Sequence, residues 1–182
     1  MSADRRSSRA KSRDRTIPGL ETLKQTPKIL ETLLAAAPRQ AFDWKPNSKR
    51  WSISQVLAHL AHVEREGFRV RVEQFVKGQP LGVYDQNAQA AAGTYSGKSA
   101  RQSLARFKRE RAKSLALLRK LPRGALERRA RHPELGNVSL RQMMHEWAFH
   151  DLGHIRQVAE LYRSRVHFPQ MGGWTRYYKI NP

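Results

Sequence analysis

Apolar residues return every three or four positions along four stretches of the chain, which is the period of an amphipathic α-helix. These stretches are about residues 18–36, 53–77, 99–121 and 140–163. The second shows the pattern through Val56, Leu60, Val63, Val70 and Val76. The last is apolar around most of its circumference, so we expect it to be the most buried helix. Because no stretch reads convincingly as a strand, the pattern predicts an all-α four-helix bundle.

Start and stop signals support these boundaries. A Ser-x-x-Gln capping box, in which both side chains bind free N–H groups of the first turn, occurs three times. The three copies lie at 52–55, 99–102 and 139–142. Gly78 and Pro122 end the second and third helices. Within the first helix, Thr26 followed by Pro27 predicts a break and a fresh start, because threonine caps a helix and proline suits its first turn.

Two connections between the helices stand out. Residues 79–98 show no periodicity, and such a long irregular segment is uncommon in a compact domain and often functional. A connection of this length allows a crossover between helices that are not simple antiparallel neighbours. Residues 132–139 have the composition of a turn.

The charge of the chain is unusual for a globular protein. It has 35 Lys and Arg against 15 Asp and Glu, a formal net charge of +20, so its surface should attract polyanions. Residues 1–16 are basic and nearly free of aliphatic side chains, so we expect a disordered tail before a single domain at 17–182. Residues 98–131 alone carry a net charge of +11. We expect the basic residues of the third helix, Arg111 among them, on its outer face.

Composition also excludes several kinds of site. The chain has no cysteine, which rules out disulfides, thiolate metal ligands and a cysteine nucleophile. No apolar run follows the basic start, as it would in a secretory signal. No window approaches the roughly 18 consecutive apolar residues of a membrane span. We therefore expect a soluble, cytoplasmic protein without a membrane partner.

The candidate chemistry begins with a histidine pair in the last helix. His150 and His154 are four residues apart, so their side chains lie on the same side of the helix. This spacing lets two imidazoles bind one ion, as in the HExxH metalloproteases. Asp151 stands where those enzymes need a glutamate base, so the metalloprotease interpretation fails.

A third ligand would have to come from another helix. His59 lies beside the apolar stripe of residues 53–77, so it should point toward the bundle interior, while His62 lies closer to the edge. Histidine pairs at this spacing also arise by chance, so spacing alone leaves open that each is a core histidine held by a hydrogen bond. Three others are poorer candidates because of their direction or their place in loops: His132, His145 and His167.

Two segments carry a family resemblance. WSISQVLAHLAHVE (51–64) and HPELGNVSLRQMMHEWAFHDLGHIRQV (132–158) resemble the second-helix and closing motifs of the DinB/YfiT-like superfamily. The resemblance covers about residues 20–165, with both motifs in the expected order. It implies an up-down-down-up four-helix bundle that is often a homodimer, with a divalent metal ion on His59, His150 and His154. His62 falls outside the family's ligand position, so it would either support the ligand histidines without binding the ion or lie at the surface.

The resemblance also implies a range of activities. Three neutral imidazoles leave a coordination position open, as in reactive metal sites, and such an ion can activate water or bind a thiolate. The family contains thiol-cofactor-dependent S-transferases or isomerases as well as hydrolases. We therefore expect an enzyme acting on a small molecule with zinc or nickel, and a low-molecular-weight thiol as a further cofactor is an open alternative.

Residues around the histidines have two interpretations each. Glu146 is four residues before His150, so it could accept a proton or a hydrogen bond there, or simply favour the helix dipole near the helix start. Gln157 could orient His154 or be an ordinary surface residue. Tyr84 and Tyr95 in the long connection could cover the site or anchor the loop.

The rival class of function is nucleic-acid binding through the basic 98–131 surface. No helix-turn-helix, RNA-recognition or zinc-finger signature accompanies the charge, so only weak, salt-sensitive and sequence-independent binding is expected. A bundle that keeps a metal ion but serves only as an interaction module is a third alternative.

Overall fold

Four long helical segments form the protein in the computed structural model, which describes residues 16–182. They are α2 (Leu20–Ala36), α3 (Ile53–Val63) continued by α4 (Arg69–Lys77), α6 (Ala100–Arg119) and α7 (Leu140–Val166). A π-helical turn, Glu64–Phe68, joins α3 to α4. The predicted all-α bundle is confirmed. The predicted disordered tail lies, except for its last residue, outside the described part of the chain.

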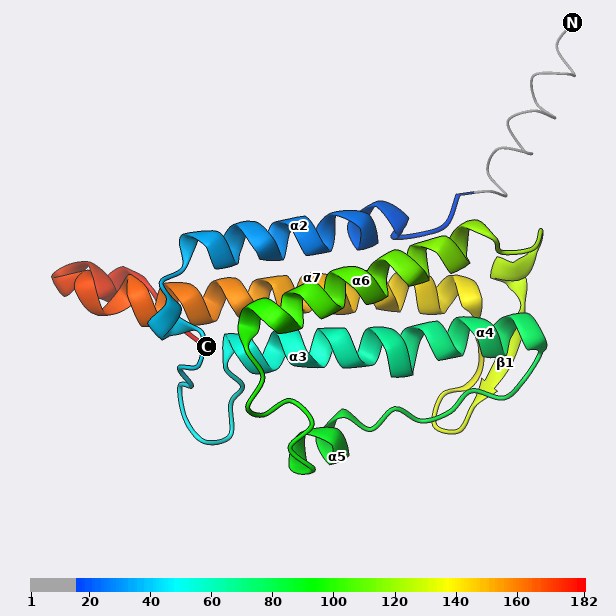
Figure 1. The fold of residues 1–182 in the computed structure, drawn as a ribbon, viewed down its shortest axis with the longest axis horizontal. Coiled ribbons are helices and arrows are strands. Elements are labelled where there is room, and N and C mark those ends of the chain that lie inside the picture. The colour runs from blue at the N-terminus through cyan, green and yellow to red at the C-terminus, as the bar shows by residue number, and fades with distance from the viewer. Residues whose placement is uncertain (1–15) are drawn as a thin grey trace, which may run out of the picture.

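The helices follow an up-down-down-up order. In Figure 1, α2 and α7 run in one direction, while α3 with α4 and then α6 run in the other. The long connection makes this possible because it carries the chain back along the bundle from the end of α4 to the start of α6. It contains a short helix, α5 (Gln86–Ala91), whose start is capped by the Asp85 carboxylate. The sequence pattern missed this helix because it is short and has no buried face.

The helix caps agree with the sequence at two of the three capping boxes. Ser52 with Gln55 and Ser139 with Gln142 form reciprocal hydrogen bonds that start α3 and α7. Ser99 precedes α6, but its side chain makes no cap hydrogen bond.

The predicted break at Pro27 is wrong, because α2 is continuous through it. A proline has no N–H, so the carbonyl oxygen of Leu23, four residues earlier, loses its helical donor. Arg111 from α6 fills that place, and its Nη1 donates to the Leu23 oxygen at 2.7 Å. A side chain from another helix thus satisfies the backbone group that would otherwise be left without a partner.

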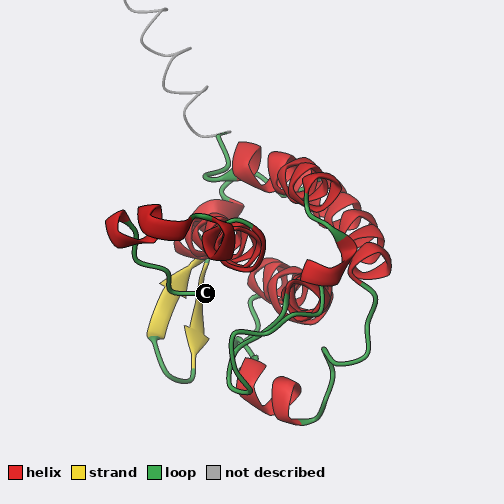
Figure 2. Ribbon diagram, turned by 90° about the vertical axis from the view of Figure 1, so that its left-hand side faces the viewer, coloured by secondary structure: helices red, strands yellow, loops and turns green. Residues whose placement is uncertain are grey.

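A β-hairpin precedes α7 where only a turn was expected. β1 (Arg129–His132) and β2 (Gly136–Ser139) pair in antiparallel register, with His132 opposite Gly136. The hairpin also contacts the long connection, since the Leu81 N–H donates to the Arg131 oxygen at 2.9 Å. Figure 2 shows the hairpin (yellow) beside the helices. Strands of four residues are too short for a clear alternation, which is why the pattern did not reveal them.

The buried apolar residues form two clusters along the bundle. One contains Phe68, Phe75, Leu140 and Trp147, and the other contains Leu30, Leu57, Phe107 and Leu161. The most enclosed helix is α3, in which nine of eleven residues are buried. The expectation that the last helix would be the most buried is therefore wrong; Phe149 on α7 is 80% exposed.

The two clusters are accompanied by a buried polar network that links the four helical segments. Its centre is Arg111, which is 1% exposed and makes paired hydrogen bonds of 2.7–3.0 Å to the carboxylates of Glu64 and Asp151. The indole N–H of Trp147 also donates to Glu64, at 3.2 Å. The expectation that Arg111 lies on the outer face of α6 is therefore wrong. Two buried carboxylates draw it inward, because an isolated buried charge would be far too costly.

Candidate metal centre

The three predicted ligand histidines meet at the middle of the bundle. His59 comes from α3, which the Ser52 capping box starts seven residues earlier, and His150 and His154 come from successive turns of α7. The Nε2 atom of His150 lies 3.2 Å from the Nε2 atoms of both His59 and His154. One nitrogen from each ring falls within 4.8 Å of the other two.

This spacing fits a single transition-metal ion. Zn–N bonds of about 2.0–2.1 Å in tetrahedral geometry place two ligand nitrogens about 3.3 Å apart. The observed 3.2 Å separations agree with that value. Three nitrogen donors would leave a fourth position for water or substrate, which is the arrangement of a reactive site and not of a closed structural one.

Burial keeps the rings in the form that binds a cation. His59 is fully buried, and burial together with the neighbouring histidines lowers its pKa to about 2. The same causes, burial first and then His154, lower the pKa of His150 to about 3. Burial also lowers the pKa of His154, although its contact with Gln157 opposes this. At neutral pH all three rings are therefore uncharged and can offer a lone pair.

Neighbouring side chains fix the orientation of the rings. Gln157 Oε1 lies 2.9 Å from His154 Nδ1, so a proton on Nδ1 directs the Nε2 lone pair toward the other histidines. This is the geometry expected of an orienting residue. The Nδ1 atoms of His59 and His150 are buried and have no hydrogen-bond partner within residues 16–182.

Aromatic contacts hold these two rings instead. Trp51 and Tyr95 lie 5.0 and 5.2 Å from the His59 ring, measured between centroids, and Tyr95 meets it edge-on. Phe68 meets His150 edge-on at 5.2 Å. The sequence pattern gave no signal for Phe68, because its position depends on the π-helical turn.

His62 and the two tyrosines of the long connection form one hydrogen-bonded chain. The Tyr84 hydroxyl lies 2.7 Å from His62 Nδ1 and 3.0 Å from the Tyr95 hydroxyl. Tyr95 is only 1% exposed. These hydrogen bonds anchor the long connection against the ring of His59. The two tyrosines therefore fit the interpretation that they anchor the loop better than the interpretation that they form a lid. His62 makes no hydrogen bond to the three histidines and contacts the site through Tyr84.

The remaining histidines lie apart from the cluster. His145 and His167 are exposed. His132 is buried in the hairpin, where its Nδ1 accepts from the Glu134 N–H at 3.2 Å. It lines the cavity beside the histidine cluster, a position that the sequence did not reveal.

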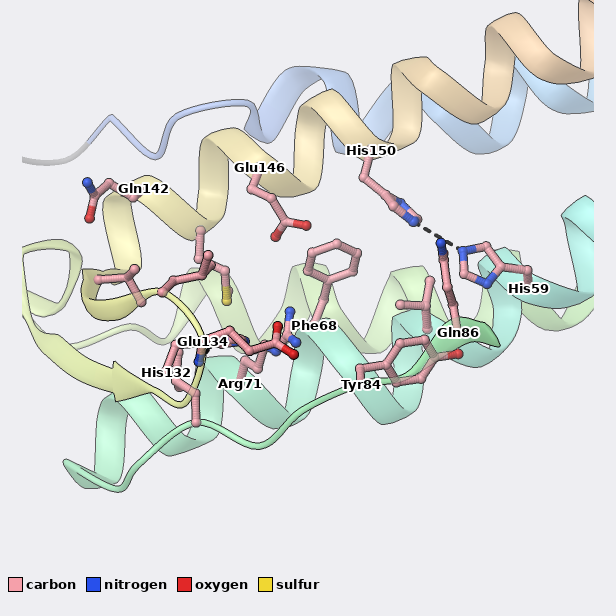
Figure 3. Close-up of a pocket in the computed structure, with 15 residues that line it drawn as sticks. His59, Phe68, Arg71, Tyr84, Gln86, His132, Glu134, Gln142, Glu146 and His150 are labelled. Carbon is pink, nitrogen blue, oxygen red and sulfur yellow. Dashed lines mark hydrogen bonds between the residues drawn. The ribbon is translucent and has the colours of Figure 1, made fainter. Parts of the chain in front are cut away.

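This cavity has a volume of about 350 Å³ and extends from His59 and His150 to the hairpin. Figure 3 shows His150 and His59 at one end and His132 and Gln142 at the other. Glu146 lies between the two ends. Although Glu146 is exposed over the residue as a whole, partial burial of its carboxylate raises its pKa, and the positive charge of Arg71 opposes this rise. The sequence did not single out Arg71, which also lines the cavity.

An all-α bundle with this helix order and three converging histidines defines a class of protein. Comparison with known protein families and structures identifies that class. The family model of the DinB superfamily matches residues 22–158, so the chain belongs to that superfamily. The chain is 22% identical, over 80% of its own length and 85% of the relative's, to "Putative metal-dependent hydrolase OB0782" of Oceanobacillus iheyensis.

The solved structure of YfiT from Bacillus subtilis shares the fold. It matches with a TM-score of 0.69 and 21% identity, over 80% of this chain and 85% of YfiT. YfiT is described as a probable metal-dependent hydrolase with an unusual four-helix bundle topology. The predicted DinB/YfiT-like membership and fold are thus confirmed.

Proposed function

We propose that this protein is a divalent-metal-dependent enzyme that hydrolyses a small molecule. The observation that carries the proposal is the convergence of three histidine nitrogens within 4.8 Å of one another at the end of a 350 Å³ cavity. The names of the two relatives support hydrolysis. Three imidazoles suit zinc or nickel, with His59, His150 and His154 as the ligands.

Each group around the site would have a separate role in hydrolysis. The bound ion would supply Lewis-acid chemistry toward a water or a substrate carbonyl. Gln157 holds His154 in the tautomer that binds a cation. Glu146 faces the cavity beside His150, so its carboxylate is placed to take a proton from an attacking water, and its raised pKa makes it a stronger base than an ordinary glutamate. The aromatic wall around His59 limits the access of bulk water.

The decisive experiment compares the purified full-length protein with His150→Ala. We expect near-stoichiometric zinc or nickel in the wild type after supplementation, and hydrolysis of some members of an ester and amide panel. The variant should lose both the ion and the hydrolysis. A wild type without near-stoichiometric metal, or a variant with unchanged hydrolysis, would refute the proposal.

Thiol transfer is the second candidate activity. The same open position could bind the sulfur of a low-molecular-weight thiol, and the basic surface could attract an anionic one. Several such thiols, each tested with an electrophilic acceptor on metal-loaded protein while hydrolysis is monitored, would separate the two activities. Homodimer formation and a cytoplasmic location stay predictions.

A further inference from the structure

An arginine inside the cavity has no partner of its own. Arg71 projects from α4 into the cavity, where Figure 3 places it between the hairpin and the end that holds His150. Its Nε atom is buried, and its guanidinium makes no hydrogen bond or ion pair with any residue from 16 to 182. A buried cationic N–H group without an acceptor is costly. The site is therefore suited to an acceptor that is not part of the described chain.

Two other arginines that face into the bundle differ from Arg71, because each has a carboxylate partner. Arg69, two residues earlier, donates to the Glu110 carboxylate at 2.6 Å, and Arg111 binds Glu64 and Asp151. Residues two apart on a helix point about 200° away from each other. Arg69 therefore faces α6, and Arg71 faces the cavity.

The rest of the cavity limits what the acceptor can be. Much of the wall is apolar: Val63, Phe68, Leu81, Val138 and Met143. Two carboxylates, Glu134 and Glu146, also line it, and neither forms an ion pair with Arg71. Their negative charges disfavour a dianion such as a phosphate monoester. A planar monoanion agrees better with these surroundings, because the guanidinium fork binds a carboxylate through two parallel hydrogen bonds.

We propose that the cavity binds a small molecule with a carboxylate held by Arg71 and an apolar body against Phe68 and Met143. The opposite end of the molecule lies at His59 and His150. The assignment of that end as the reacting end rests on the proposed metal-dependent function, whereas the contact with Arg71 does not. Arg71 is in this sense a residue that determines substrate specificity.

The test measures binding directly, by isothermal titration calorimetry on the full-length, zinc-loaded protein. The probes are 4-phenylbutanoate and its uncharged amide. We expect the acid to bind about 10- to 100-fold more tightly than the amide, as for a charge-assisted hydrogen-bonded pair. Arg71→Gln should abolish this preference and leave the affinity for the amide unchanged. Arg71→Lys should keep part of it, because the charge stays but the fork is lost.

Two controls make the result specific. Arg109→Gln removes the same charge from an exposed position on α6 and should leave both affinities unchanged. His150→Ala distinguishes the two possible partners of the probe's carboxylate. If zinc binds the carboxylate, the affinity of the protein for the acid should fall in this variant; if Arg71 binds it, that affinity should be kept. Equal affinities of wild type and Arg71→Gln for the acid would overturn the inference.

The inference and the proposed function can fail independently. Absence of metal and of hydrolysis would refute the function, while the acid preference and its loss in Arg71→Gln could still be measured. Thermal unfolding checks that the variant is folded, which we expect because Arg71 has no hydrogen bond to lose. If Arg71→Gln should unfold, Arg71→Met and Arg71→Lys decide in its place, since only the lysine variant should retain a preference for the acid.

Discussion

At the scale of single residues, the main property of the histidine cluster is that burial keeps its imidazoles unprotonated. A buried imidazole with other imidazoles around it resists taking up a proton, which is why the pKa values of His59 and His150 fall to about 2 and 3. A transition-metal cation that binds imidazole nitrogen, such as zinc or nickel, can occupy the lone pairs that carry no proton. The free energy of metal binding should then appear as free energy of folding, because the unfolded chain has no such cluster.

The first prediction is therefore that zinc stabilises the wild type and not His59→Ala. At a free zinc concentration 100 times the dissociation constant, the free energy of unfolding should rise by about 2.7 kcal/mol. Urea denaturation with zinc and with a chelator measures this gain. His145→Ala, which removes an exposed histidine from the same helix as His150, should gain as much as the wild type. An equal gain in His59→Ala would place the ion elsewhere.

The second prediction concerns Glu110. Its burial would raise the pKa, but hydrogen bonds from Lys113 and Arg69 outweigh this and hold the pKa below the usual 4.5. A carboxylate with a lowered pKa stabilises the folded state above the unfolded-state pKa, and the contribution is lost as the pH falls through the folded-state value. Urea denaturation from pH 7 to pH 3 should show wild type more stable than Glu110→Gln above pH 4.5.

The comparison with Glu110→Gln isolates this group, because the buried histidines titrate alike in both proteins. The difference between the two free energies of unfolding should be constant between pH 6 and 7 and should shrink below pH 4.5. A difference that stays constant down to pH 3 would mean that the carboxylate gains nothing from Arg69 and Lys113.

At the scale of the elements, one side chain connects all the long helices. Arg111 of α6 binds the backbone of α2 at Leu23, Glu64 in the π-helical turn after α3, and Asp151 of α7. Burial alone would lower the pKa of Arg111, but the two carboxylates raise it, so it stays charged. Asp151 follows His150 directly, so this network also fixes the turn of α7 that carries the histidines.

The third prediction is that Arg111→Met destabilises the protein by about 3–5 kcal/mol, because it leaves two buried carboxylates without a counter-charge. Arg109→Met, on the exposed face of the same helix, should change stability by less than about 0.5 kcal/mol. Adding Glu64→Gln and Asp151→Asn to Arg111→Met should restore part of the loss. Chemical denaturation of wild type and the three variants tests this, and an Arg111→Met variant as stable as the wild type would contradict it.

The same elements show which features of the fold and of the site could be predicted from the sequence. The helical periods and capping boxes predicted four helices with nearly correct ends, and the two family motifs predicted the histidines that the structure brings together. Arg111 was misplaced because its neighbours on α6 are exposed and basic, and only the tertiary position of Glu64 and Asp151 shows that it is buried. Pro27 suggested a break because its compensating donor, Arg111, lies 84 positions away along the chain. Arg71 was not predicted as a site residue, because an arginine on a helix is usually solvated and only the tertiary structure shows that it lines the cavity.

At the scale of the whole molecule, the interior makes the surface still more basic. Within residues 16–182 three carboxylates, Glu64, Glu110 and Asp151, are buried, whereas Arg111 is the only buried Lys or Arg. The formal net charge of +20 is thus borne by a surface that has lost more acids than bases. No helix in residues 16–182 is long and apolar enough to cross a membrane. Solvated basic helix faces of this kind bind polyanions without reading their sequence.

The last prediction is that the protein binds duplex DNA only through this charge. Fluorescence anisotropy with two unrelated duplexes of equal length should give equal affinities, falling about 10³-fold or more between 50 and 200 mM salt if six phosphates are contacted. Replacing three exposed arginines of α6 by glutamine should reduce the slope of log affinity against log salt by about three. These are Arg101, Arg109 and Arg119.

A charge-matched control decides whether the surface of α6 matters. Replacing three exposed basic residues outside 98–131 removes the same net charge: Lys28, Arg39 and Lys49. If the α6 face contacts the DNA, the first triple variant should lose more of the salt slope than the second, because only close phosphate contacts release counterions. Equal losses would mean that net charge alone attracts DNA. Binding that persists near physiological salt with a preference for one duplex would instead make nucleic-acid recognition a function of this protein.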